Sequence, residues 1–166
     1  MNWINAIGFN IIWFGCVFLG NSFTPIALCL LLAHLIFVNN KGKELFIIIS
    51  VSVVGLFIDS LLVYFHVYNF NQLDPDPLFV IPFWLIILWA AFAATINHSL
   101  SFINKYTFVK FLAGLLVVPL SYLAGNNFHA VEFGYSVVTT FFILSLTWGM
   151  LIPLLFSLSN IKVLER

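Results

Sequence analysis

The chain has 166 residues and a formal net charge of zero, with 63% hydrophobic and only 7% charged residues. Soluble domains carry roughly a quarter charged residues, so too few charges are present here to surround an apolar core, and lipid must cover most of the surface. The zero net charge gives no electrostatic support to a nucleic-acid partner, and we expect none.

Six apolar stretches are long enough to be transmembrane helices, because a bilayer core of about 30 Å needs about 20 helical residues. Their approximate ranges are residues 3–20, 23–38, 45–68, 78–100, 107–124 and 135–158. Polar turns separate them, including the run Asp-Pro-Asp-Pro at 74–77, which cannot enter lipid. No segment is long and polar enough for a soluble domain. The sequence predicts one all-α domain over residues 1–166, a polytopic transmembrane bundle of six helices.

The basic residues predict the orientation of this bundle. They fall in or beside the second connection, the fourth connection and the C-terminal tail: Lys41, Lys43, Lys105, Lys110, Lys162 and Arg166. With six spans these regions share one side. The loops of the opposite side contain no Lys or Arg, only Asp74, Asp76, His129 and Glu132. The positive-inside rule then places both termini in the cytoplasm.

Small and polar residues form a stripe along the third span, where Ser52, Gly55, Asp59 and His66 recur at helical spacing. Similar stripes run along the first, fourth, fifth and sixth spans. One interpretation is a packing seam, because small residues let helices approach closely in lipid. The alternative is a polar cavity lined by the same residues, since ionisable groups within a membrane are costly and often functional.

Asp59 lies roughly 20 Å from the cytoplasmic end of its span, at 1.5 Å per residue. Trp84, Ser121 and Tyr122 are predicted at a similar height. Because no Lys or Arg reaches this level, the carboxyl is expected to carry a proton, or to meet His66 or a water. It is either a proton-carrying or catalytic acid or a hydrogen-bonded structural group.

A second polar layer is predicted nearer the cytoplasm, formed by Asn10, His34 and Asn97 with His98 at its lower edge. The two histidines could join a metal site, but the predicted spans place no carboxylate or thiolate at that depth, and zinc usually takes at least three protein ligands. On the outer face, acidic residues and the histidines His66 and His129 are spread over loops. We therefore expect no metal and no cofactor, and no catalytic sequence motif is present.

Two stretches carry a family resemblance. The segment LWAAFAATINHSL at 88–100 resembles the LWAAFATTLNHSL signature of a bacterial membrane-protein family of unknown function, DUF2878. The segment PLSYLAG at 119–125, followed by AVE at 130–132, is similar to that family's GPLSYLAG…AVEF pattern, except that Val118 replaces the glycine. The resemblance implies a protein of the bacterial inner membrane. It also implies genes that are often encoded near enzymes modifying membrane fatty acids, including cyclopropane-synthase-like ones.

Three classes of function follow as hypotheses. The first is a lipid-linked enzyme or accessory factor in membrane fatty-acid or lipid modification, with a membrane lipid as partner. Its catalytic groups would be Asn97, His98 and Asp59, and its substrate pocket would comprise Trp84, Trp89, Tyr122, Ser121, Asn10 and His34. The second is a small proton-coupled transporter or channel working as a homo-oligomer, although the sequence shows no internal repeat. The third is a structural or assembly partner of other membrane proteins.

Overall fold

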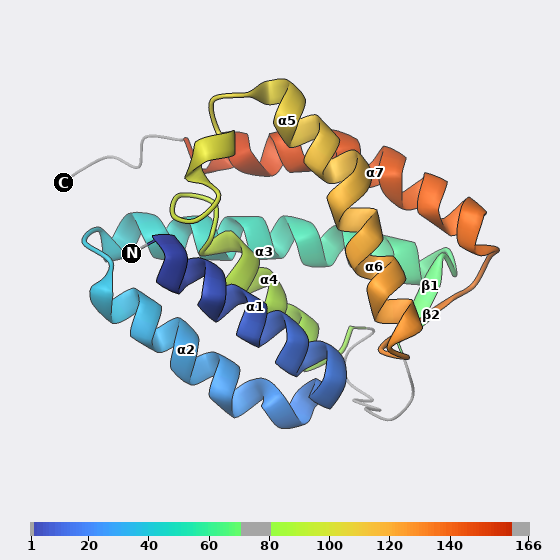
Figure 1. The fold of residues 1–166 in the computed structure, drawn as a ribbon, viewed down its shortest axis with the longest axis horizontal. Coiled ribbons are helices and arrows are strands. Elements are labelled where there is room, and N and C mark those ends of the chain that lie inside the picture. The colour runs from blue at the N-terminus through green and yellow to red at the C-terminus, as the bar shows by residue number, and fades with distance from the viewer. Residues whose placement is uncertain (1, 71–80, 161–166) are drawn as a thin grey trace.

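The computed structural model describes residues 2–70 and 81–160, and within these ranges the chain is mostly helical (Figure 1). The longer helices are α1 (Asn2–Leu19), α2 (Thr24–Phe37), α3 (Lys41–Tyr64), α4 (Phe83–Ala93), α6 (Val118–Asn127) and α7 (Val137–Leu158). A short α5 (Thr107–Leu112) continues through the π-helical turn η3 (Ala113–Val117) into α6, and two strands, β1 (Tyr68–Phe70) and β2 (Val131–Phe133), pair with each other.

Among the described residues, four helical stretches are long and apolar enough to cross a membrane: Asn2–Phe37, Lys41–Tyr64, Thr107–Asn127 and Val137–Leu158. The first of them turns back on itself at the 3-10 helix η1 (Gly20–Phe23), so that α1 packs beside α2. α4 is also apolar but has only 11 residues. The prediction of an all-α chain is confirmed, and the architecture is compatible with a membrane helical bundle.

The helices expose many large apolar side chains, and they bury a few polar side chains within a mainly apolar core. On α7, side chains spaced by four face outward: Val138, Phe142, Leu146, Met150 and Leu154. The opposite face is fully buried and includes Thr140, Leu144 and Trp148. An exposed apolar stripe of this extent on a helix is typical of contact with lipid rather than with water.

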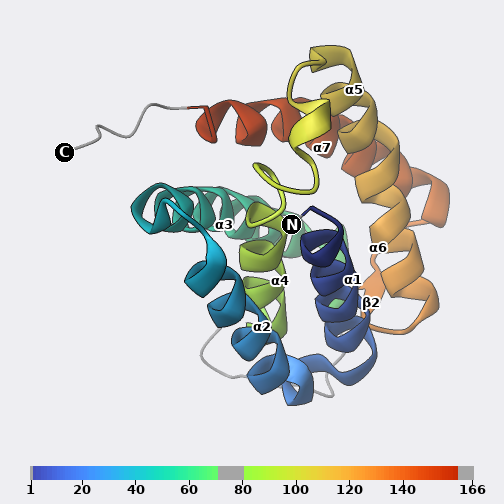
Figure 2. The same cartoon turned by 60° about the vertical axis from the view of Figure 1, so that its left-hand side comes forward.

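The helices form two groups that α3 connects. α1, α2 and α4 pack against one another, whereas α5 and α6 pack against α7 (Figures 1 and 2). α3 contacts both α4 and α7. Glycines permit two of the closest approaches: a Cβ on Gly114 would overlap the backbone carbonyl of Trp148, and a Cβ on Gly55 would overlap the ring of Trp89. These contacts are those of a packing seam.

One end of the bundle is held by side chains of the connections. Asn5 at the start of α1 bonds to the backbone N–H of Ser99, after α4. The amide of Asn104, before α5, exchanges hydrogen bonds of 3.0 and 3.2 Å with Asn160, after α7. The start of α1 and the end of α7 therefore lie at the same end of the molecule.

The opposite end contains a repeated structure that the sequence analysis missed. α3 is followed by Phe-His-Val-Tyr-Asn-Phe (65–70), and α6 is followed by Phe-His-Ala-Val-Glu-Phe (128–133). His66 and His129 both adopt positive φ, 55° and 60°, directly after a helix. The backbone hydrogen bonds also correspond, since each histidine N–H donates to the residue three before it. A short internal repeat therefore relates residues 65–70 to residues 128–133, which the sequence analysis did not predict.

The pairing of the two strands obeys a local two-fold symmetry. Tyr68 lies opposite Phe133, Asn69 opposite Glu132, and Phe70 opposite Val131. Asn69 and Glu132 occupy the same position in the two copies, so the axis passes between them. The end of a helix, a turn and a strand thus occur in the same order in two related units, α3–β1 and α6–β2.

Two predicted spans differ from the helices observed. The third begins earlier, at Lys41, because the side chain of Asn40 caps the helix by accepting a hydrogen bond of 3.0 Å from the Lys43 N–H. It also ends earlier, at Tyr64. The fourth, predicted over 78–100, ends as an α-helix at Ala93 and continues as consecutive turns, while its residues 78–80 lie outside the described part.

Asn5 explains the early end of α4. Its Nδ2 donates to the carbonyl of Ala94 at 3.1 Å, and its Oδ1 accepts from the N–H of Ser99 at 3.2 Å. In a continuous α-helix these two backbone groups would bond to residues four positions away. Because Asn5 satisfies them instead, the chain leaves the helix without orphaned polar groups, and the segment that carries Asn97 and His98 is a turn.

Candidate functional site

A cavity of about 1010 Å³ lies between α1, α4 and α6. α1 packs on α2 and α4 but scarcely touches α6, and the cavity occupies the space between them. Its lining extends along α1 from Asn2 to Val17, which corresponds to about 22 Å of helix. Phe70 and Val131 line it at the end with the strands, and Ser99 and Phe102 at the other end.

Five of the six residues predicted for a substrate pocket line this one cavity: Asn10, Trp84, Trp89, Ser121 and Tyr122. The sixth, His34, does not line it and belongs to a different group, described below. The other lining residues are mainly aromatic and aliphatic. The cavity is therefore apolar with a few polar atoms, which is the common composition of small-molecule sites.

Asp59 lies behind one wall of the cavity, completely buried. Its Oδ1 accepts hydrogen bonds from the hydroxyls of Tyr68, at 2.7 Å, and Tyr122, at 2.6 Å. Its Oδ2 accepts from the indole N–H of Trp89 at 2.7 Å. Of the alternatives predicted for Asp59, the contact with His66 is wrong, because the partner from that part of the chain is Tyr68.

Two of these donors connect Asp59 to the cavity. Trp89 and Tyr122 both line the cavity, whereas Asp59 does not. Their rings also pack on Trp148, with centroids 5.2 and 6.1 Å away. Burial and the neighbouring Asp59 raise the pKa of the Tyr68 hydroxyl well above its usual value, so Tyr68 remains a donor at physiological pH. The cluster can fix the orientation of the cavity wall.

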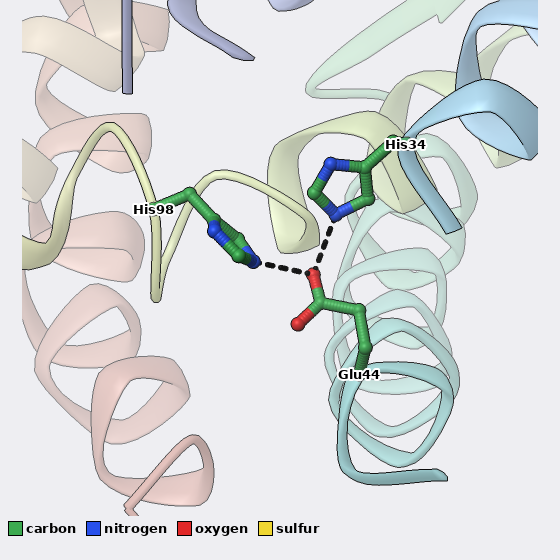
Figure 3. A group of neighbouring side chains, drawn as sticks. All are labelled: His34, Glu44 and His98. Carbon is green, nitrogen blue, oxygen red and sulfur yellow. Dashed lines mark hydrogen bonds and ion pairs between the residues drawn. The ribbon is translucent and has the colours of Figure 1, made fainter. Parts of the chain in front are cut away.

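A second polar group, His34, Glu44 and His98, lies toward the opposite end of α3 (Figure 3). The Oε1 of Glu44 is 2.8 Å from the Nε2 of His34 and 3.2 Å from the Nε2 of His98. The imidazole rings are 4.8 Å apart and nearly perpendicular. All three side chains are at least four-fifths buried, and their ligand atoms lie within 4.8 Å of one another. This donor set could hold a metal ion.

Three elements bring these side chains together. His34 lies in the last turn of α2, and Glu44 in the first turn of α3, where the helix dipole favours a negative charge. His98 lies in the turns that Asn5 anchors. The Asn5 Nδ2 is also 3.5 Å from the His34 Nδ1, an arrangement that favours a proton on the His34 Nε2 facing Glu44.

Glu44 was missed from the sequence. It lies in the predicted connection before the third span, and the expectation that no carboxylate accompanies the two histidines is wrong. Asn97 is half-buried, and no hydrogen bond or ion pair links it to the described members of this group. Asp59 and Glu44 are separated by about 22 Å along α3, so Asp59 and His98 do not share one site.

The residues predicted for the outer face do not form a group of three possible metal ligands in the described part of the chain. His66 and His129 occupy the two equivalent turns, and Glu132 lies in β2 opposite Asn69. Asp74 and Asp76 fall outside the described residues.

These features define an apolar helical protein with a large apolar cavity and a separate polar centre at one end. Residues 2–154 match the family model described as "Protein of unknown function (DUF2878)". The chain belongs to this family, as its two sequence segments indicated. No curated protein and no solved structure matches the chain.

Proposed function

We propose that the protein is an integral membrane protein that binds a membrane lipid in the cavity between α1, α4 and α6, and acts in lipid or fatty-acid modification as an enzyme or accessory factor. The observation that carries this proposal is the cavity itself, about 1010 Å³ in volume and lined along about 22 Å of α1. An elongated apolar space of this size suits an acyl chain better than a polar solute.

The position of the cavity mouth supports a ligand that arrives from the bilayer. Phe14, Val117 and Leu120 line the cavity and are also 48%, 63% and 52% exposed. The opening therefore lies on the apolar outer surface of the helices. Inside, Asn10, Ser121 and Tyr122 supply the few polar atoms that could orient the ligand.

In this proposal Asp59 is a positioning residue rather than a catalytic one. It holds the Trp89 and Tyr122 side chains in the cavity wall but does not line the cavity. His98 is adjacent in sequence to Ser99, which lines the cavity at its other end. Any chemistry on a bound lipid would therefore involve the Ser99 end.

We also propose six membrane spans in the bacterial inner membrane with both termini in the cytoplasm. The short α4 and its following turns would provide the fourth span, and the two arms of Asn2–Phe37 the first and second. Hydrogen bonds place the start of α1 and the end of α7 at the same end of the bundle. This arrangement supports the proposal that both termini lie on the same side of the membrane.

The test uses a cavity-filling variant. Ala124 lines the cavity, and Ala124→Trp should obstruct it; Cys29→Trp is the control, because Cys29 is exposed on α2 and does not line the cavity. Native mass spectrometry of the purified proteins should detect bound lipid in the wild type and in Cys29→Trp, and much less in Ala124→Trp. In cells, the lipid profile of a deletion strain is compared after complementation with each protein. The wild type and Cys29→Trp should restore the parental profile, and Ala124→Trp should not.

Two results would contradict the proposal. One is equal lipid occupancy in the wild type and Ala124→Trp, which would exclude the cavity as the lipid site. The other is a deletion strain whose lipid profile equals that of its parent strain, when the parent is confirmed to express the protein. That result would favour a role in transport or assembly.

A further inference from the structure

We propose that His34, Glu44 and His98 form a binding site for one divalent transition-metal ion, with Zn²⁺ as the best-fitting ion. The site would have two imidazole ligands and one carboxylate ligand, and at least one open coordination position. This inference does not depend on lipid binding, because none of the three residues lines the cavity.

The distances already approach those of a coordination sphere. Ligand atoms at about 2.1 Å from a tetrahedral ion lie about 3.4 Å from one another. The Glu44 Oε1 is 2.8 Å from the His34 Nε2 and 3.2 Å from the His98 Nε2, and all three ligand atoms lie within 4.8 Å. Small side-chain rotations, without movement of the helices, would accommodate an ion. Figure 3 shows both rings turned toward the same carboxylate.

A single hydrogen bond, between the His34 Nε2 and the Glu44 Oε1, joins members of this group, so an ion could complete the set of ligands. The Nε2 of His98 is buried and has no hydrogen-bond partner with adequate geometry in the described residues, although it is directed at the Glu44 carboxylate. A metal ion between the three groups would bind this nitrogen and displace the proton from the His34 Nε2.

The elements around the group hold the ligands in place without an ion. The ends of α2 and α3 fix His34 and Glu44, and the two backbone contacts of Asn5 fix the turn that carries His98. The Asn5 Nδ2 also lies 3.5 Å from the Nδ1 of His34. Hydrogen bonds to the outer side of a ligand orient that ligand in known metal sites.

The ligand types select the class of ion. Imidazole nitrogens suit Zn²⁺ and neighbouring transition metals, whereas Mg²⁺ and Ca²⁺ prefer oxygen ligands. Two histidines and one glutamate with an open position form a ligand set found in catalytic zinc sites, while structural zinc sites usually have four protein ligands.

The experiment measures Zn²⁺ binding by the full-length protein in detergent, after removal of any affinity tag and treatment with a chelator. Calorimetric titration and elemental analysis should give one Zn²⁺ per wild-type chain and no comparable binding of Mg²⁺. We expect His34→Ala, Glu44→Gln and His98→Ala each to weaken Zn²⁺ binding at least about a hundredfold, since even outer-shell changes cost 10–100-fold. The control is His66→Gln, which removes a histidine outside the group.

Circular dichroism separates loss of the site from loss of the fold. Glu44→Gln retains the shape of the side chain and one acceptor oxygen that can face the His34 Nε2, so this variant should remain folded and still fail to bind Zn²⁺. The proposal is overturned if the folded wild type binds no stoichiometric Zn²⁺, if folded Glu44→Gln binds as tightly as the wild type, or if His66→Gln loses binding to the same extent.

Discussion

The hydroxyl of Tyr122 donates a hydrogen bond of 2.6 Å to the carboxylate of Asp59, and this bond joins α6 to α3. The same carboxylate accepts hydrogen bonds from Tyr68 and Trp89, so one fully buried side chain connects four segments of the chain. Three donors on one carboxylate satisfy a group that would otherwise be costly to bury. Asp59 is therefore central both to the stability of the bundle and to the shape of the cavity wall.

Replacing Asp59 by Asn should lower the free energy of unfolding by about 1–3 kcal/mol. The amide NH₂, itself a donor, would take the place of an acceptor oxygen and would face the donor group of a tyrosine or of Trp89. Denaturant titration of the purified protein in detergent, followed by circular dichroism, measures this change. Ser60→Ala is the control: its hydroxyl bonds only to Leu56 of its own helix, so its effect should stay within about 0.5 kcal/mol. Equal stabilities of Asp59→Asn and the wild type would show that the cluster contributes little.

The contact between Gly55 and Trp89 can be tested by adding one methyl group. In Gly55→Ala the new Cβ would overlap the Trp89 ring and displace its N–H from Asp59. We expect a loss of about 1–3 kcal/mol in unfolding free energy from overpacking. Gly8→Ala is the matched control because nothing lies within 4 Å of its added Cβ, and the change should stabilise α1 by up to about 1 kcal/mol. A stabilised Gly55→Ala would contradict the packing described.

Asn5→Ala should loosen the turns after α4, because the Ala94 carbonyl and the Ser99 N–H both lose their partner. A lost hydrogen bond of about 1 kcal/mol corresponds to roughly a fivefold to tenfold faster amide exchange at Ser99 and its neighbours. Hydrogen–deuterium exchange with mass spectrometry reports this. Asn10→Ala provides the comparison, since the Asn10 amide bonds only to Ala6 within α1. Unchanged amide exchange in Asn5→Ala would show that the turns after α4 are stable without the hydrogen bonds of Asn5.

Cysteine labelling tests the proposed orientation. In a background without Cys16 and Cys29, a cysteine at Glu132 should react with a membrane-impermeant maleimide added to intact cells, and a cysteine at Asn39 should react only after lysis. Both positions are exposed in the connections at opposite ends of the bundle. The reverse pattern would invert the orientation, and labelling of both in intact cells would exclude the six-span topology.

The helical architecture could be predicted because long apolar runs leave few alternatives in a chain with so few charges. The ends of the helices were harder. The charged run from Lys41 to Glu44 indicated a connection, but the Asn40 cap begins α3 within it and turns Glu44 toward His34. An Asn before this run is a recognisable start signal for a helix and could have indicated the carboxylate.

The end of α4 could not be predicted from its own sequence. It depends on Asn5, which lies 94 residues away from Ser99 along the chain and replaces two hydrogen bonds of the helix. The repeated Phe-His pattern, by contrast, was visible in the sequence. Each copy is only six residues long, however, and the pattern predicts no structure without the strand pairing that the structure provides.

The repeat explains why Asp59 and Tyr122 meet. They are 63 residues apart, the same offset that relates Phe65 to Phe128, so they hold the same position in the two units. In a dimer of identical single units, that contact would bring together two copies of one side chain, and two aspartates would repel unless they shared a proton. In this single polypeptide the two equivalent positions carry different side chains, so that one is the acceptor and the other the donor.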